Sequence, residues 1–437
     1  MVKAAIWIIY ILLAFGSAVL FRRIVVRSIG FATGALAGLI YFLAIPLFIV
    51  LLTGQLESPF LAADNYDPFT DLETTLVLFL GWLAVLAACA VSHRNSSRNI
   101  GPSKVSQNTI TYLRVLLALY LVFSVYALFA SGIGAAGSHW HLTIATKLAT
   151  STTFIIIKNF LDAFRVMVFG LLLFTLNNNQ ISKRTAILIA ISIATIDLAT
   201  TFNRITIVFL LFFLLILLRR YWYAYLAAVA SLISAAITVS AAWPVFRGII
   251  FSERITALSV IESWNSALNA TSFSGNQLAD KLNVLFESSN IIVLKYIVDN
   301  LGNTVPYFMG STFLVRPLTT FLPSTVWANK PRVFGTYLGE IIESHPGLAL
   351  NSTLFGEAYA NFGIFWILFL FGFIVIFHAL YRVVGNTIPG MENMGFFIGI
   401  AVWRFEANFA SVSLYAALML WMTFRSLRIL KRRRSHK

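Results

Sequence analysis

Charged residues and cysteine are scarce in this sequence of 437 residues. Asp, Glu, Lys and Arg make up 11% of it, whereas 59% of the residues are hydrophobic; a soluble globular protein carries charge on about a quarter of its residues. The one cysteine, Cys89, lies within an apolar run, which excludes a disulfide framework and a cysteine-based metal site. The composition therefore excludes a soluble enzyme, a disordered chain and a fibrous protein, and it indicates a membrane protein.

Long apolar runs recur along the chain, and a run of about 20 such residues is enough to cross a bilayer as a helix. The spans must be helical, because lipid offers no hydrogen-bond partner to a free backbone N–H. We predict an all-α polytopic membrane protein with about eleven transmembrane helices. The predicted spans are 4–20, 29–53, 74–92, 110–130, 154–176, 185–202, 205–218, 221–242, 362–381, 393–406 and 408–424. The chain is thereby divided into a first set of helices (1–242), a large external loop (243–361) and a C-terminal set with a basic tail (362–437).

Acidic residues are few, 17 against 32 Lys and Arg, which gives a net charge of +15. The bases gather in alternate loops and in the tail, together with a single acid, Glu392. They are Arg22, Arg23, Arg27, Arg94, Arg98, Lys104, Lys183, Arg184, Arg219, Arg220, Arg382 and those between Arg425 and Lys437. The positive-inside rule then predicts a C-terminus in the cytoplasm and an N-terminus outside. The basic tail is expected to lie on anionic lipid headgroups. The excess of positive charge is therefore explained by the orientation of the chain in the membrane, and we predict no nucleic-acid partner.

The external loop 243–361 is much longer than an ordinary connection, and such loops are usually functional or structured. Apolar residues at helical spacing over 276–301 predict one or two helices. The side chains suited to face lipid at the interface are Ile291, Ile292, Leu294, Ile297 and Val298. The segment 306–335 is rich in Pro, Gly and aromatic residues and predicts ordered coil with short turns.

Three of the arginines inside or beside predicted spans are candidates for function, because charge in such positions is costly and commonly functional. Arg165 lies in the span 154–176, Arg204 precedes the span 205–218, and Arg404 lies at the junction of the last two spans. The predicted topology places all three toward the outer leaflet. A guanidinium group suits a phosphate or pyrophosphate, so we predict substrate-binding roles for them. Arg165 has an alternative role, since Asp162 three residues earlier shares its helix face and can pair with it.

The external loop adds further candidates for binding and catalysis. His345 is a candidate general base, because histidine titrates near neutral pH, or else an ordinary loop residue. Glu357, in the motif GEAYANFG, is suited to accept a proton or bind a sugar, or alternatively to cap a helix. The bases predicted to bind substrate there are Arg247, Arg254, Arg316 and Lys330. No adjacent pair of acids of the kind that holds a metal stands out, so we predict neither a metal site nor a cofactor.

A different pattern predicts helix packing rather than chemistry. Gly30, Gly34 and Gly38 recur every four residues, and small residues at that spacing let two membrane helices approach closely.

Several segments together resemble the bacterial oligosaccharide repeat-unit polymerases, the Wzy-type polymerases of O-antigen and exopolysaccharide. One dominant external loop before the last three spans matches the layout of that family. The matching segments are Arg316 with the following FLPSTVWANKP, Gly339–Pro346, GEAYANFGIFW, FNR at 202–204 and WRFE at 403–406.

The resemblance implies a glycosyltransferase of the GT-C type, related to the O-antigen ligases. Such an enzyme moves a growing glycan from undecaprenyl pyrophosphate onto another lipid-linked repeat unit, at the outer face of the bacterial plasma membrane. It implies functional arginines in the outer loops and a ligase-like histidine at His345. The implied arginines are Arg204, Arg247, Arg254, Arg316 and Arg404. The implied partners are undecaprenyl-pyrophosphate-linked oligosaccharides and membrane lipids, with a chain-length regulator and a flippase in the same assembly.

Three alternatives stay open at this point. An O-antigen ligase would perform the same chemistry with a lipid A-core acceptor. A flippase or transporter of lipid-linked sugars would show an internal repeat and charges through both leaflets, neither of which the sequence displays. A structural partner in a polysaccharide assembly complex would use its aromatic residues for packing.

Overall fold

The computed structural model describes residues 2–27, 29–53, 66–96, 108–130, 152–201, 205–218, 287–320, 329–343 and 350–435, with a few isolated positions between them. Within these ranges the regular structure is helical, apart from an isolated bridge between Leu301 and Val305. Six stretches of the described residues are long and apolar enough to cross a membrane. They are Val2–Val25, Phe31–Leu52, Leu72–Arg94, Thr109–Ala127, Phe160–Asn177 and Thr353–Gly385. The chain is therefore an α-helical, membrane-embedded protein.

The predicted spans coincide with helices wherever the structure describes them. The helices are α1 (Val2–Arg27), α2 (Phe31–Leu39) continued by the π-helix η1 (Ile40–Ala44) and α3 (Ile45–Thr53), α4 (Leu72–Ser96), α5 (Asn108–Ala130), α7 (Thr152–Asn177), α8 (Lys183–Thr201), α9 (Ile205–Leu218), α17 (Trp366–Gly385) and α18 (Met391–Ser435). The predicted span 221–242 lies outside the described residues apart from isolated positions. The total of eleven stays a prediction.

The chain divides into two compact units. Unit 1 comprises Met1–Leu116, Val166–Ser182 and Asn290–Lys437, and unit 2 comprises Leu117–Arg165 and Lys183–Ser289. The candidate site described below lies in unit 1.

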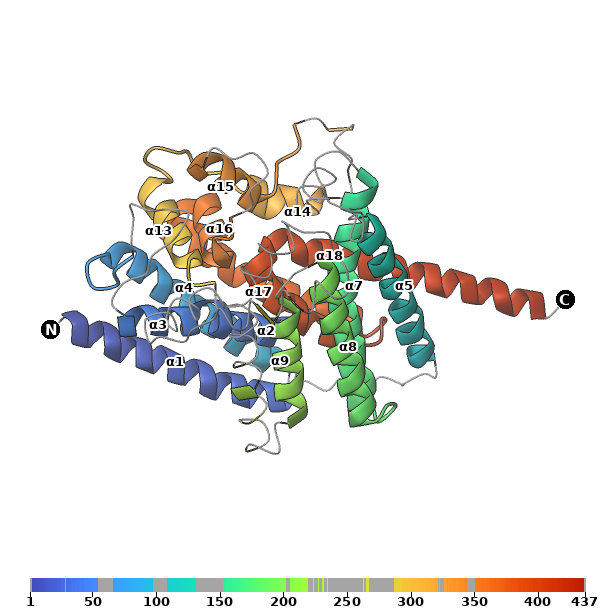
Figure 1. The fold of residues 1–437 in the computed structure, drawn as a ribbon. Coiled ribbons are helices and arrows are strands. Elements are labelled where there is room, and N and C mark those ends of the chain that lie inside the picture. Colours follow the sequence, from blue (N-terminus) through green and yellow to red (C-terminus); the bar gives the residue numbers. More distant parts are fainter. Residues whose placement is uncertain are drawn as a thin grey trace. The chain divides into compact units, whose positions relative to one another are not determined.

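The centre of unit 1 is the close packing of α2 against α18 (Figure 1). Every residue of α2 is buried. A Cβ atom on Gly34 would overlap the backbone carbonyl of Phe396, and one on Gly38 would overlap the ring of Trp403. The Trp403 indole N–H donates to the Ala35 carbonyl oxygen at 2.8 Å. The predicted packing role of the glycine pattern is thus confirmed.

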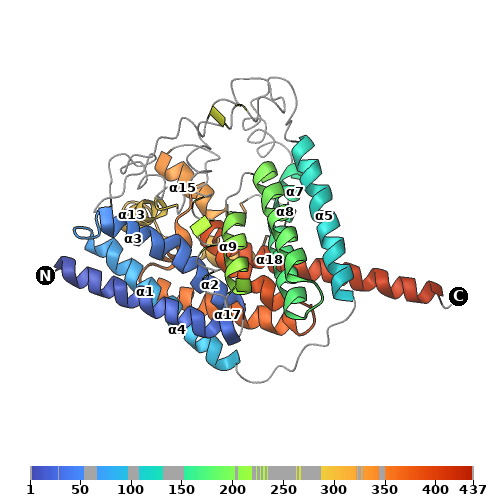
Figure 2. The same cartoon turned by 60° about the horizontal axis from the view of Figure 1, so that its bottom comes forward.

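The last part of the external loop folds as a set of short helices. These are α13 (Asn290–Asn300), the π-helix η2 (Ser311–Val315), α14 (Arg316–Leu318), α15 (Phe334–Glu343) and α16 (Thr353–Phe362), which continues through a 3₁₀ turn, η3 (Gly363–Phe365), into α17. Figures 1 and 2 both show α13 and α15 close together. A shared hydrophobic cluster joins them: Val293, Ile297 and Leu301 of the α13 region, Phe334 and Leu338 of α15, Leu350, and Ala360 of α16.

The predicted helix within 276–301 exists over the range of α13, but its expected contact with lipid is wrong. Ile291, Ile292, Leu294, Ile297 and Val298 are at most 2% exposed. The reason is that α13 packs against α16 and α4, so its apolar face is covered by protein.

One residue interrupts α18. Glu406 has φ 68° and ψ 172°, a conformation that lies outside any helix and that a residue with a side chain rarely adopts. The break falls at the predicted boundary between the spans 393–406 and 408–424. It creates a helix end inside unit 1, with backbone groups that require partners.

Candidate functional site

The second half of α18 begins at Ala407, and a side chain from α16 satisfies its first amide. The Ala407 N–H donates to Glu357 Oε2 at 2.7 Å. Glu357 is completely buried, and its other oxygen, Oε1, has no hydrogen-bond partner among the described residues. A carboxylate at a helix N-terminus is favourable because it accepts free N–H groups and faces the positive end of the helix dipole. Of the roles predicted for Glu357, capping a helix is the one its contacts show, and the capped helix belongs to α18.

Glu406, at the break itself, caps a second helix. Its Oε2 accepts from the Phe334 N–H at 3.0 Å, and its Oε1 accepts from the Gly335 N–H. These are the first two amides of α15. The Glu406 carboxylate therefore fixes the external-loop helix α15 to the break in α18. Hydrogen bonds hold its unusual backbone conformation in place: its side chain is bonded to α15, and the next amide, Ala407 N–H, is bonded to Glu357. Strained residues at functional sites are commonly held in this way.

Two cationic side chains of the external loop belong to this region: Arg316 lies near the Glu406 carboxylate, and Lys330 lies near Arg316. Arg316 Nη1 donates to the Pro331 carbonyl oxygen at 2.6 Å, and Lys330 Nζ donates to the carbonyl oxygens of Thr320 at 3.0 Å and Leu322 at 2.8 Å. Burial lowers the pKa of Arg316, and the nearby Glu406 carboxylate opposes that shift. The pKa of Lys330 is lowered by burial and by repulsion from Arg316. Arg316 is thus close enough to Lys330 to disfavour the charged form of that lysine.

The same loop segment is also attached directly to the second half of α18. The Thr320 hydroxyl and the Asn408 side-chain oxygen are 2.6 Å apart, and that hydroxyl also lies 2.9 Å from the Arg316 carbonyl oxygen. Arg316 Nε is buried and has no hydrogen-bond partner within the described part of the chain. A buried N–H without a partner is costly, and an anion at this position would satisfy it.

The motif GEAYANFG joins these parts. Asn361, one turn after Glu357, accepts from the backbone N–H groups of Thr312 at 3.3 Å and Phe313 at 3.4 Å, and it donates to the Thr312 hydroxyl at 2.7 Å. Its amide also donates to the Glu357 carbonyl oxygen at 2.7 Å. One face of α16 therefore holds both the start of η2, which leads into Arg316, and the break in α18.

The remaining predicted residues have different surroundings. Arg404 is half-buried and lies two residues before Glu406 in α18. In unit 2, Arg165 is fully buried, with its Nη2 atom 3.0 Å from Asp162 Oδ1 and 2.7 Å from Asp197 Oδ1. Two carboxylates neutralise this guanidinium, so the alternative structural role predicted for Arg165 describes its contacts. The other candidates, His345, Arg204, Arg247 and Arg254, lie outside the described residues.

The sequence reasoning missed Glu406, Thr320 and Asn408. Glu406 stands two residues after Arg404, and residues two apart on a helix face different sides, so the sequence did not pair them. The available signal was its position at the boundary of two predicted spans, where an acidic side chain is suited to cap a helix. Nothing along the sequence indicated that the capped helix would be α15.

No protein-family model, curated protein or solved structure matches the chain. Among the described residues, no three His, Cys, Asp or Glu side chains gather in a way that would hold a metal ion. The chemistry of the site therefore has to be argued from its own residues.

Proposed function

We propose that this protein is a polysaccharide polymerase of the bacterial plasma membrane, a GT-C-type glycosyltransferase. It would transfer a glycan from undecaprenyl pyrophosphate onto another lipid-linked repeat unit at the outer face. The observation that carries the proposal is a pair of cations, Arg316 and Lys330, that backbone carbonyl groups of one loop segment hold in place, with Arg316 close to the Glu406 carboxylate at the break in α18. A diphosphate would relieve their repulsion and provide an acceptor for the buried Arg316 Nε–H.

For this reaction the enzyme has to supply mainly positive charge for the leaving group and a fixed position for the two reactants. The acceptor hydroxyl oxygen attacks the anomeric carbon of the donor, and the bond from that carbon to the pyrophosphate oxygen breaks with its electrons. Arg316 and Lys330 of the external loop would stabilise the leaving diphosphate, and Arg404 of α18, two residues before the break, would be a third cation. A base takes the hydroxyl proton. The two candidates are His345 and Glu357, whose Oε1 is unused by the helix cap.

We expect Arg316→Ala to reduce elongation of a purified lipid-linked repeat unit by roughly a hundredfold, the typical effect of removing one preorganised charge donor. Products are read as glycan chain length on a gel. The matched control is Arg332→Ala, in the same segment, because Arg332 is exposed and pairs with Glu340 at the surface. Normal chains from Arg316→Ala, or equal losses in both variants, would contradict the proposal.

A second expectation concerns metal ions. Pyrophosphate is already a good leaving group and the side chains supply positive charge, so elongation should continue in EDTA. Complete loss in chelator, restored by added divalent cation, would show that the charge comes from a metal instead.

The O-antigen ligase alternative uses the same site chemistry and differs only in its acceptor. The elongation assay distinguishes the two when lipid A-core and a second repeat unit are offered together as competing acceptors. A polymerase lengthens the repeat unit, whereas a ligase labels the lipid A-core. A flippase would do neither and would instead move the labelled lipid across a vesicle membrane.

A further inference from the structure

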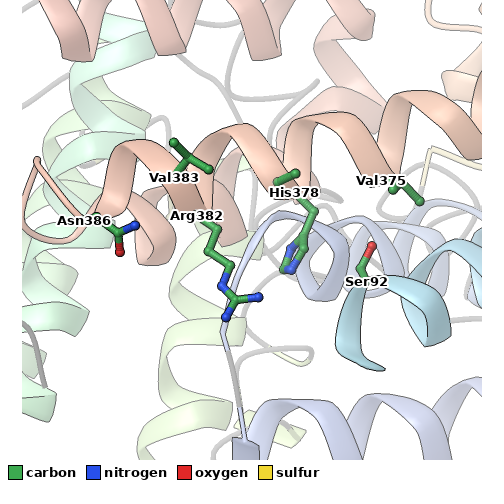
Figure 3. Close-up of a pocket in the computed structure, with 7 residues that line it drawn as sticks. Ser92, Val375, His378, Arg382, Val383 and Asn386 are labelled. Carbon is green, nitrogen blue, oxygen red and sulfur yellow. The ribbon is translucent and has the colours of Figure 1, made fainter. Parts of the chain in front are cut away.

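A cavity of about 350 Å³ lies between α4 and the C-terminal part of α17, and its lining includes no residue of α18. This volume is within the range of small-molecule sites, roughly 300–1,000 Å³. His378 and Arg382 of α17 and Asn386, which caps its C-terminal end, follow each other at intervals of four, so they share one face of the helix. Figure 3 shows His378 and Arg382 extending from α17 toward the side on which Ser92 of α4 lies.

Two polar groups of the cavity lack partners. His378 is 5% exposed, and its Nδ1 accepts from the Ala32 N–H at 3.4 Å. The imidazole must then carry its proton on Nε2, which makes Nε2–H a donor. That atom has no hydrogen-bond partner among the described residues, and neither has the buried hydroxyl of Ser92. Two buried donors and the Arg382 guanidinium thus border one space, which is an arrangement suited to an oxyanion.

The charges around the cavity are mainly basic. Arg382 and His93 are both electrostatic neighbours of His378. Among the described residues, Glu392 is an acidic neighbour of Arg382; burial raises the pKa of this carboxyl group, and Arg382 opposes that shift. A buried carboxyl group with a raised pKa weakens the positive field less than an exposed one would.

The same helix also lines the cavity with apolar side chains, and this apolar surface continues onto the outside of α17. Val375 and Val383 line the cavity, and Val383 is 65% exposed. Ile376 and Leu380, on the same helix, are 58% and 40% exposed. A helix face of this kind in a membrane protein borders lipid, so a molecule already in the bilayer can reach the cavity from the side. By the positive-inside rule, this end of α17 is the cytoplasmic one, where anionic lipids are concentrated.

We propose that this cavity binds the headgroup of an anionic phospholipid from the cytoplasmic leaflet. The phosphate would contact Arg382, His378 Nε2–H and the Ser92 hydroxyl, and the first acyl carbons would lie along Val375 and Val383. This site is separate from the proposed glycan site and does not depend on its function.

The test uses the full-length protein in detergent micelles, with retained lipid counted by native mass spectrometry. We expect phosphatidylglycerol to bind and phosphatidylcholine to bind at least about tenfold more weakly. Arg382→Gln should weaken phosphatidylglycerol binding by a similar factor. The matched control is Arg22→Gln, which removes an exposed arginine on the same predicted side of the membrane. Asn386→Trp provides a second variant that fills the cavity from an exposed position and so leaves the core unchanged.

Three outcomes would overturn the proposal. The first is equal binding of the two lipids. The second is phosphatidylglycerol binding that survives both Arg382→Gln and Asn386→Trp while each variant unfolds at the normal temperature. The third is displacement of the lipid by millimolar inorganic phosphate, which would show a site for free phosphate only.

Discussion

Glu357 and Glu406 both cap the start of a helix from another part of the chain. The Glu357 carboxylate accepts from the Ala407 N–H, and the Glu406 carboxylate accepts from the first two amides of α15. They are also electrostatic neighbours of each other. Two buried carboxylates in one place are costly unless N–H groups and cations surround them. Here the helix starts supply the N–H groups, and Arg316 supplies positive charge. Buried carboxylates beside a cation are typical of sites of acid–base chemistry.

Substitutions of Glu357 separate its two candidate roles. Glutamine keeps an oxygen that accepts from the Ala407 N–H, whereas alanine leaves that buried amide without a partner at a cost of about 1–3 kcal/mol. We therefore expect Glu357→Gln to unfold near the normal temperature in detergent and Glu357→Ala to unfold clearly below it. If Glu357 is also the base, Glu357→Gln should be folded but unable to elongate glycans. A folded and fully active Glu357→Gln would assign the proton transfer elsewhere, with His345 the remaining candidate.

At the scale of elements, the close contact of α2 and α18 depends on glycine. Gly34→Val would place its side chain against the backbone of Phe396, which cannot move away without separating the two helices. We expect this variant to accumulate poorly in the membrane and to lose several degrees of thermal stability in detergent, since overpacking costs about 1–3 kcal/mol. Gly372→Val, on α17, is the matched control, because nothing lies within 4 Å of the added Cβ there. Equal stability of the two variants would contradict the packing role of Gly34.

The helices could be predicted because a span is a local property of the sequence. A run such as 205–218 is apolar throughout, and lipid leaves it no alternative to a helix. The glycine pattern at Gly30, Gly34 and Gly38 was similarly readable, since only close packing explains it. The burial of Ile291 and Val298 was not, because an apolar helix face looks the same in sequence whether lipid or α16 covers it.

The candidate site was predictable only in part for the same reason. The sequence indicated the cations Arg316 and Lys330 as ligands of a phosphate, and it indicated Glu357 as a base or a helix cap within GEAYANFG. The bond between Glu406 and the start of α15 joins positions 71 residues apart in sequence, and no periodicity relates them. The contacts of Arg165 could likewise be predicted only where the partner is near in sequence. Its pairing with Asp162 follows from helical spacing, but Asp197, 32 residues away, decides that the guanidinium is fully neutralised.

At the scale of the whole molecule, the proposed function requires that Arg316 and Lys330 face the outside. The charge distribution predicts this orientation, and labelling of introduced cysteines can measure it. The one native cysteine, Cys89, is buried, and its thiol donates to the Ala32 carbonyl oxygen at 3.1 Å. Single cysteines can therefore be introduced into the native sequence without a competing reactive thiol.

We expect Arg332→Cys, in the external loop, to react with a membrane-impermeant maleimide on intact cells or spheroplasts, because this position is 61% exposed and outside by the predicted topology. Ser426→Cys, on the exposed part of α18 toward the basic tail, should react only after the membrane is permeabilised. The unsubstituted chain controls for Cys89 and should stay unlabelled under both conditions. The reverse pattern would place the Arg316 segment in the cytoplasm, where the proposed donor and acceptor are not presented, and the polymerase proposal would then fail together with the predicted side of the lipid cavity.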